Sequence, residues 1–451
     1  MAMKTVLRNA TVFRFDGYRH VPVKTDVYFD SHIQGFSESH PSDSGYIEHN
    51  MRGRIIGPGF IDTHCHGGGS GLNSTEGRYN PATEMIEGGA DEEVLAGILR
   101  AHAKHGTTTM FLSSLAAPED RIRRFIGAAE KLYGKPGSER GGAEFGGIDC
   151  EGTFLCPSDD GAYVGCLDPK YMHPASVGRF KGIFGDAEKM VKKVGIGFDW
   201  DSYSPESDPV GLAEYLVERG IMPCTGHSGA SMKQVMCAIK AAGSMVFIHY
   251  GNGPNKSNLK PGFEGTMEAI PFAAGMDKEV YNIYAEHILD GVHVSPSFSA
   301  FAYGLFGPDR LIGVTDNIGI SGDYDIKRIK LGAVTAQIGQ HDKRALWKEG
   351  CEGKTLVGSR ATCNDLFRYA MGLLTSHMDP KNIYAMYTCE KFGPFPRDEA
   401  LSSCFKMLCS NPAKAYGLSD RGEISAGKRA DLIALGSDNN VERVWVGGNL
   451  I

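Results

Sequence analysis

The alternation of short apolar runs with amphipathic segments is the feature that most constrains the fold of this chain. Residues 91–105 carry a helical apolar stripe, with Asp91 as the predicted N-cap and Gly106 as the end, and a β-branched run follows at 107–114. The same order recurs along 209–229 and 232–253, and 307–317 supplies another short apolar run. Repeated βα units predict a parallel sheet, and about 350 residues of them fit a (β/α)8 barrel. A doubly wound open sheet is the alternative, although no G-x-G-x-x-G sequence opens a helix after the first strand.

Both ends of the chain have a different pattern, because they are rich in strand-forming residues. Runs of β-branched and aromatic residues occupy 4–13, 21–29, 431–435 and 441–448. We therefore predict an α/β protein with two domains. Residues 58–410 form the TIM-like barrel. Residues 1–57 together with 411–451 form a small β-sandwich, and the tail also supplies a helix around "NPAKAYG".

Composition and charge exclude several classes of function. The 451 residues are 41% hydrophobic and 22% charged, with a net charge of −7 and no basic block, so we expect neither a nucleic-acid surface nor a membrane surface. No window reaches the roughly 18 apolar residues of a membrane helix, and the start "MAMKTVLRNATVF" lacks the apolar core of a signal peptide. Eleven irregularly spaced cysteines indicate a reducing compartment, so we expect a cytoplasmic protein.

Polar side chains follow the predicted strands where those strands end. Since the C-terminal ends of the strands in a parallel barrel open on one face, these side chains are expected to meet there. Two of the histidines are two residues apart, so in a strand they point the same way and can share one ion. The glycines after this pair leave room for a substrate. The set comprises His64, His66, Glu151, His227, His249 and Asp316.

Together, the six residues have the ligand types of a catalytic metal site. Taken singly, each has a structural explanation: a strand-end histidine is often hydrogen-bonded within the fold, Glu151 suits a loop, and Asp316 suits a helix cap. As a set, imidazoles and carboxylates suit Zn²⁺, Fe²⁺, Mn²⁺ or Co²⁺ with a position left open for water. A metal lowers the pKa of its bound water to near neutral, so the set predicts a metal-dependent hydrolase.

On these and neighbouring motifs the chain resembles the amidohydrolase superfamily, and within it the N-acetylglucosamine-6-phosphate deacetylases. "PGFIDTHCHG" (58–67) looks like the first metal motif of the family in its two-histidine form. "GIDCEGTFL" (147–155) is similar to the family's G-x-H-L-E-G-P-F-L. Further similar segments cover most of the chain, at 226–231, 248–253, 289–296, 313–317, 356–370 and 411–435.

The resemblance implies a role for each candidate residue. Glu151, His227 and His249 bind a divalent metal, and His64 with His66 holds a second ion that Glu151 bridges. Asp316 takes the proton from the attacking water and returns it to the leaving amine. One or two ions are expected, zinc first, with iron, manganese and cobalt as alternatives. The implied reaction converts N-acetylglucosamine-6-phosphate to glucosamine-6-phosphate and acetate.

The resemblance also implies substrate-binding residues. Tyr163 stands where the family has a histidine that holds the substrate, and its hydroxyl is a candidate donor to the oxyanion. Lys256 or Lys260 takes the place of an arginine that the family uses for the sugar phosphate, as a point charge rather than a fork. The remaining positions, matched by the D-G-x-H and "HYGNGP" segments, are Asp290, Gly291, His293, Asn252 and Gly253.

Several departures from the family pattern leave the substrate open. Asp149, Cys150 and Thr153 replace the His, Leu and Pro of the glutamate motif, and the segment 376–398 is longer than expected. A different N-acetylated sugar or another amide is therefore an alternative substrate, whereas deaminases of the superfamily usually carry other motifs. A metal-lacking paralogue is the non-enzyme alternative, and the presence of all six ligand-type residues argues against it. The expected partners are a phosphorylated amino sugar and a second copy of the chain in a homodimer.

Overall fold

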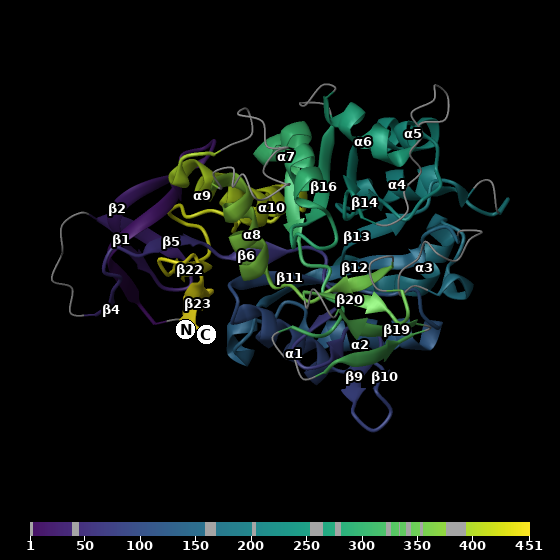
Figure 1. Ribbon diagram of the computed structural model, residues 1–451, viewed down its shortest axis with the longest axis horizontal. Coiled ribbons are helices and arrows are strands. Elements are labelled where there is room, and N and C mark those ends of the chain that lie inside the picture. Colours follow the sequence, from purple (N-terminus) through teal and green to yellow (C-terminus); the bar gives the residue numbers. More distant parts are fainter. Residues whose placement is uncertain are drawn as a thin grey trace.

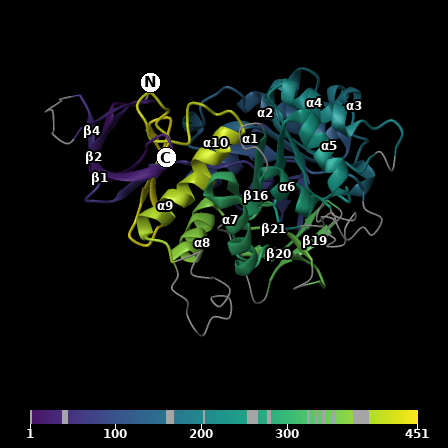
Figure 2. The same cartoon turned by 90° about the horizontal axis from the view of Figure 1, so that it is seen from above.

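The computed structural model describes residues 3–37, 45–157, 168–200, 204–252, 265–275, 281–321, 326–332, 334–339, 344–351, 355–375 and 394–451. Two bodies lie side by side in both ribbon views, a smaller one that contains both chain ends and a larger one that contains most of the helices (Figures 1 and 2). The larger body is the barrel.

Eight parallel strands form the barrel, and each pairs with its neighbour in chain order. The first and last strands meet through side chains and loops, because Thr315 Oγ1 donates to Asp62 Oδ2 at 2.6 Å and Asp316 N donates to His64 O at 2.9 Å. The predicted (β/α)8 architecture is thus confirmed. The strands are β6 (Phe60–Asp62), β11 (Thr107–Ser113), β12 (Glu144–Phe154), β13 (Val191–Ile196), β14 (Met222–Thr225), β15 (Ser244–Phe247), β16 (Asn282–Ile288) and β17 (Leu311–Val314).

The helices cover the outside of this barrel, and α1 shows why they form where they do. Asp91 Oδ1 accepts a hydrogen bond from Val94 N at 2.8 Å, and Gly106 has a positive φ of 91° beyond the last turn. The predicted apolar stripe of α1 is buried, and each buried Leu or Ile contributes about 1.5–3 kcal/mol. The helices are α1 (Glu92–Ala103), α2 (Glu119–Leu132), α3 (Val177–Phe184), α4 (Pro209–Glu218), α5 (Met232–Ala242), α6 (Thr266–Gly275), α7 (Pro296–Arg310) and α8 (Cys363–Thr375).

The smaller body is a β domain in which the two chain ends share one sheet. Ile56 of β5 lies opposite Ala434 of β22 in an antiparallel pair, which joins the N-terminal strands to the C-terminal ones. A domain built from both termini is therefore confirmed. Its strands are β1 (Thr5–Phe15), β2 (His20–Phe29), β3 (Ile33–Ser37), β4 (Ile47–Asn50), β5 (Ile55–Pro58), β22 (Leu432–Leu435), β23 (Val441–Val446) and β24 (Asn449–Leu450).

The segment between the two bodies belongs to both. It runs through α9 (Arg397–Phe405), a π-helical turn (Lys406–Ser410) and α10 (Asn411–Ala415). Just after α10, the Tyr416 hydroxyl donates to Glu286 Oε1 at 2.8 Å inside the barrel, and Arg421 donates to Thr109 Oγ1 at 2.9 Å. The first part of the tail thus packs on the barrel, and the domain boundaries at residues 57/58 and 410/411 stay predictions.

A third sheet lies inside the range 58–410, and the sequence analysis did not foresee it. Its first strand directly follows His66, and at its other end Ser359 N donates to Asp316 O at 3.1 Å. The sheet therefore connects the loops that follow the first and last barrel strands. Its strands are β7 (Gly67–Gly68), β8 (Leu72–Asn73), β9 (Gly77–Asn80), β10 (Met85–Gly88), β18 (Arg328–Leu331), β19 (Val334–Ile338), β20 (Ala345–Lys348) and β21 (Leu356–Ser359).

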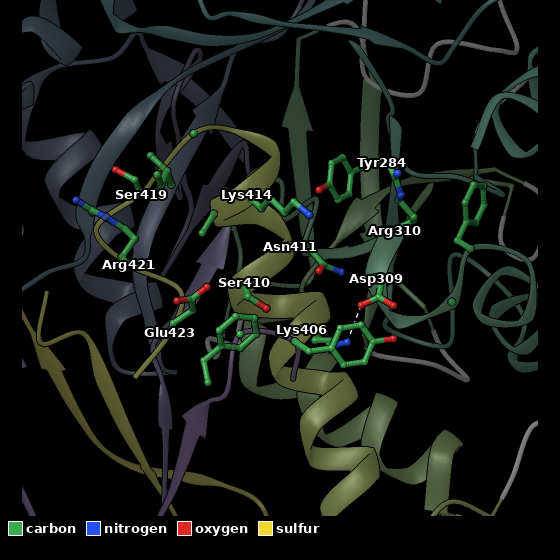
Figure 3. A pocket seen from close by; sticks show the side chains of 18 of the residues that line it. Tyr284, Asp309, Arg310, Lys406, Ser410, Asn411, Lys414, Ser419, Arg421 and Glu423 are labelled. Atoms are coloured by element: carbon green, nitrogen blue, oxygen red, sulfur yellow. Dashed lines mark hydrogen bonds and ion pairs between the residues drawn. The ribbon is translucent and has the colours of Figure 1, made fainter. Parts of the chain in front are cut away.

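A cavity of about 990 Å³ lies where the tail meets the barrel (Figure 3). Arg310 and Tyr284, near the N-terminal ends of β17 and β16, line it, and so does Lys406, whose Nζ donates to Asp309 at 2.6 Å. These strand ends are opposite the ends that carry the predicted ligands, and none of the described candidate ligands lines the cavity. Among the described residues, the helices include none that is long and apolar enough to cross a membrane.

A buried histidine between the two bodies makes folding stability depend on pH. His20 begins β2, is 1% exposed, and places Nε2 3.2 Å from Ser410 Oγ. Burial, together with the charge of Lys406, lowers its pKa to about 3. In the unfolded chain the same histidine binds a proton near pH 6.5, so the unfolded state binds more protons between about pH 6.5 and 3. The contribution of the neutral, buried His20 to the free energy of unfolding is therefore complete above about pH 6.5 and is lost as the pH falls.

His20→Gln is expected to remove this pH dependence while keeping a hydrogen-bonding group near Ser410. Between pH 7 and pH 5 the wild-type chain should lose about 2 kcal/mol more unfolding free energy than the variant, as the linkage relation gives for such a shift. Urea denaturation of both chains with excess chelator, at the two pH values, measures the difference. Equal losses in the two chains would contradict a neutral buried His20.

Candidate metal centre and active site

The predicted ligands lie at one end of the barrel, at equivalent places after their strands. His64, His227, His249 and Asp316 each come two residues after the last residue of a strand, namely β6, β14, β15 and β17. Glu151 lies near the end of β12. Because all these strands run in parallel, their C-terminal ends share one face, where barrel enzymes have their active sites.

Three of these residues have an unusual backbone conformation. His227, His249 and Asp316 have positive φ angles of 44°, 36° and 48°. A residue other than glycine in this region costs of the order of 1–3 kcal/mol, and such strain gathers at functional sites because the surrounding structure must enforce it. This observation supports a functional role and leaves no trace in the sequence.

The carboxylate of Glu151 lies at the centre of four imidazoles. Its Oε2 is 2.8 Å from His66 Nε2, and its Oε1 is 3.1 Å from His249 Nε2. Oε1 is also 3.5 Å from His64 Nε2 and 3.8 Å from His227 Nε2. All six predicted ligand-type residues meet here, because Asp316 Oδ1 lies 3.5 Å from His64 Nε2 and 3.6 Å from His66 Nε2.

The donor set fits a divalent metal. The carbonyl of Asn252 lies 3.3 Å from His249 Nδ1, which leaves Nε2 of that ring for the site, an arrangement typical of metal-binding histidines. His64 Nε2 is buried, yet it makes no hydrogen bond within the described part of the chain. Imidazole nitrogens and carboxylate oxygens are suitable ligands for zinc, iron, manganese or cobalt.

The distances group the ligands differently from the sequence prediction. Among the predicted ligands, two sets of three have ligand atoms within 4.8 Å of one another: His64 with Glu151 and His249, and His64 with His66 and Asp316. His64 thus belongs to both sets, whereas His227 lies furthest from Glu151 of the four imidazoles. The arrangement fits one or two ions, and the individual ligand roles stay predictions.

The two carboxylates of the site are ionised at neutral pH. Burial raises the pKa of Asp316, but the nearby imidazoles of His64, His66 and His249 outweigh burial and lower the pKa to about 2. The pKa of Glu151 is likewise well below its usual range, because His64, His249 and His66 outweigh the effect of burial. Asp316 can therefore accept a proton from a water molecule at neutral pH.

The predicted substrate residues are described only in part. His293 Nδ1 lies 2.7 Å from Asp290 Oδ2, and Asp290 Oδ1 also accepts from the backbone N of His293 at 2.9 Å. His293 Nε2 is buried and makes no hydrogen bond within the described residues, so it is free for a ligand. Gly291 between them has φ +70°, and a Cβ there would lie 2.4 Å from the Tyr369 ring.

The other predicted substrate positions have different outcomes. Asn252 is half-buried, and its backbone carbonyl contacts the His249 ring, so its described role is to orient that ring. Most of the longer segment 376–398 lies outside the described residues, and so do Gly253, Tyr163, Lys256 and Lys260.

Sequence reasoning missed a buried charged group directly behind His64. Lys193 on β13 is 0% exposed and lies between Asp149 of β12 and Glu286 of β16, at 3.0 and 2.8 Å. In the sequence, Asp149 stands out only as a departure from the family motif. A signal was available, because Lys193 and Glu286 are charged residues within otherwise apolar barrel strands, where unpaired charges are not tolerated.

Comparison with known proteins assigns the class. The sequence profile described as "Amidohydrolase family" matches residues 55–451, which is most of the chain. The protein therefore belongs to the amidohydrolase family, and the resemblance read from its motifs is confirmed.

The chain is also similar to individual proteins of known activity. The chain is 26% identical to the N-acetylglucosamine-6-phosphate deacetylase of Bacillus subtilis, over 88% of this chain and 84% of that protein. It is 25% identical to the N-acetylgalactosamine-6-phosphate deacetylase of a Shewanella strain, over 87% and 82%. A mutant N-acetyl-D-glucosamine-6-phosphate deacetylase of Mycobacterium smegmatis, solved with N-acetyl-D-glucosamine-6-phosphate, superposes with a TM-score of 0.76 at 25% identity, covering 99% of both chains.

Proposed function

We propose that this protein is a metal-dependent deacetylase of an N-acetylated amino-sugar phosphate, with N-acetylglucosamine-6-phosphate as the first candidate substrate. The products are glucosamine-6-phosphate and acetate. The observation that carries the proposal is the buried meeting of four imidazoles with Glu151 and Asp316 at the C-terminal end of the barrel. The kinship with sugar-phosphate deacetylases supplies the substrate class.

The proposed mechanism assigns the metal to the residues around Glu151. His64, His66, His227 and His249 would hold it together with that carboxylate, as one or two ions. When bound, a divalent metal would polarise the acetamide carbonyl and lower the pKa of water, which would supply the nucleophile. Asp316 Oδ1 accepts the proton of that water and then donates it to the amide nitrogen, which must be protonated before the amine can leave.

The substrate is held by residues at the rim of the site. Asp290 fixes the ring of His293 so that Nε2 faces the substrate, where it contacts the sugar or its phosphate. Tyr163 is proposed as a donor to the oxyanion of the tetrahedral intermediate, and removing such a donor costs on the order of 10²–10³ in rate. Lys256 is proposed to bind the phosphate, and Asn252 with Gly253 completes the wall of the site.

N-acetylgalactosamine-6-phosphate is a second candidate substrate. The Shewanella relative that is named for this sugar has almost the same identity to the chain as the Bacillus relative. The two sugars differ only in the configuration of one hydroxyl group, and the reacting acetamide is the same in both. Sequence similarity to known relatives therefore supports both sugars as candidate substrates.

Acetate release from a panel of sugars tests the proposal. We expect turnover with N-acetylglucosamine-6-phosphate or N-acetylgalactosamine-6-phosphate, much weaker turnover with the unphosphorylated sugars, and loss of activity after dialysis against a chelator. Elemental analysis should find one or two equivalents of a divalent metal, zinc first. A protein that contains no metal and releases no acetate from any sugar would overturn the proposal in favour of a non-catalytic paralogue. Size-exclusion chromatography tests the predicted homodimer.

A further inference from the structure

A fully buried lysine lies in the centre of the barrel, directly behind His64. Lys193 Nζ is 2.8 Å from Glu286 Oε2, 3.0 Å from Asp149 Oδ2 and 3.1 Å from His64 Nδ1. These charged residues come from three barrel strands, and their side chains are 0–1% exposed. We call Asp149, Lys193 and Glu286 the charged triad.

Hydroxyl groups from other parts of the chain donate further hydrogen bonds to the charged triad, although Asp149 Oδ1 is buried without a partner among the described residues. Ser113 Oγ donates to Asp149 Oδ2 at 2.7 Å. Thr63 Oγ1 and the Tyr416 hydroxyl donate to Glu286 Oε1 at 2.6 and 2.8 Å. Replacing buried ion pairs by apolar residues is often neutral or stabilising, so the need to fold does not by itself account for such a network.

The charged triad leaves one net negative charge on the far side of the His64 ring. His64 Nδ1 is 3.4 Å from Asp149 Oδ2 and 3.6 Å from Glu286 Oε2. The opposite nitrogen, Nε2, faces Glu151 and Asp316, each at 3.5 Å. A carboxylate that accepts the second N–H of a metal-binding histidine fixes the ring and makes it a stronger ligand.

The groups next to Nδ1 of His249 and the groups next to Nδ1 of His64 differ in charge. His249 Nδ1 is held by the neutral carbonyl of Asn252, whereas His64 Nδ1 faces two carboxylates and an ammonium group. His64 is also the residue that belongs to both three-residue ligand sets. The charges around the His64 ring therefore affect both three-residue ligand sets.

We propose that the charged triad positions His64 for metal binding and sets the affinity of the protein for the ion that His64 holds. This inference rests on the proposed function, because it assumes a metal at the site. The carboxylates of Asp149 and Glu286, 3.4 and 3.6 Å from His64 Nδ1, act on the ring through their negative charge, which favours a proton on Nδ1 and so leaves Nε2 for the ion. Lys193 holds the two carboxylates in place and offsets one of their two charges. The three are positioning residues that do not touch the substrate.

The test measures zinc affinity of the full-length, metal-free protein by competition with a chromophoric chelator. Asp149→Asn and Glu286→Gln each remove one negative charge with little change in shape, and each should weaken the His64-dependent binding step 10–100-fold, as losses of second-layer partners do. His64→Ala identifies that step. Glu188→Gln is the matched control, because Glu188 is a half-buried carboxylate bonded to Tyr215 on the outside of the barrel. It should leave the affinity unchanged.

A double-mutant cycle separates positioning from general destabilisation. In the His64→Ala background, Asp149→Asn and Glu286→Gln should cause no further loss of zinc affinity, since the residue they act through is gone. If either charge variant fails to fold, Ser113→Ala and Tyr416→Phe each remove one hydrogen bond from the same carboxylates and should weaken the same step by a smaller factor.

Four outcomes of this test can be distinguished. Zinc affinity that is unchanged in the charged-triad variants overturns the positioning role, and so does an equal loss with and without His64. A wild-type chain that binds neither zinc nor iron, manganese or cobalt overturns the proposed function itself. Weakening that appears only when His64 is present supports the inference.

Discussion

Asp316→Asn should lower kcat for the deacetylation by the 10²–10⁴-fold that is typical of a lost general acid–base group. The amide cannot accept a proton from water or return one to the leaving nitrogen. Asparagine is the right replacement, because Asp316 has φ 48° and asparagine tolerates this region better than most residues. Backbone geometry and side-chain size are therefore kept while the base is removed.

The metal content and the KM of this variant distinguish a role of Asp316 in proton transfer from a role in binding. Metal content should stay largely intact and KM should change far less than kcat, since the residue acts mainly in the transition state. If Asp316 were only a structural cap, its loss would cost about 1 kcal/mol of stability and leave turnover near normal. Asp309→Asn is the control, because Asp309 is a half-exposed carboxylate that pairs with Lys406 at the opposite end of the barrel. Wild-type kcat in Asp316→Asn would remove this residue from the mechanism.

The barrel and its ligands could be predicted because they depend on local pattern. The apolar stripe of α1 and the capping Asp91 are readable within one segment, and so are the apolar runs that become the barrel strands. The topology then places the strand ends together, so His227, His249 and Asp316 could be expected at one site without any distance being known.

The third sheet could not be predicted, because its strands are only two to five residues long and its middle pair joins distant segments. β10 pairs with β18 through Met85 and Lys330, on opposite sides of the barrel sequence. Such short strands have no usable alternation, and glycines at Gly67 and Gly68 weaken the signal further.

The buried network of charged and hydroxyl groups behind His64 also could not be predicted from local sequence patterns. Thr63, Lys193, Glu286 and Tyr416 come from four distant segments, and their meeting depends on the closed barrel. Asp149 shows the same limit. The sequence alone does not explain why Asp149 replaces the histidine of the family motif. The folded barrel does, because Asp149 forms a salt bridge of 3.0 Å with Lys193 on the neighbouring strand.

Glu151→Gln should have the largest effect on the metal, because this carboxylate is the group that all four imidazoles share. The change keeps the size of the side chain but removes the negative charge and turns one oxygen into a nitrogen that cannot bind a cation. Loss of an outer partner of a ligand already costs 10–100-fold in affinity, so loss of this ligand should cost more than about 100-fold. Acetate release should fall to the level of the chelated wild-type enzyme.

Thermal unfolding gives a second measurement that does not depend on activity. A ligand that binds only the folded state at 100 times its Kd stabilises that state by about 2.7 kcal/mol, so added zinc should raise the Tm of the wild type and of Glu188→Gln but not that of Glu151→Gln. His227→Ala should also lose metal and activity, and because His227 Nε2 lies 3.8 Å from Glu151, further than the other imidazoles, its loss of affinity should be the smaller of the two. Full metal content and turnover in Glu151→Gln would mean that the ion lies elsewhere.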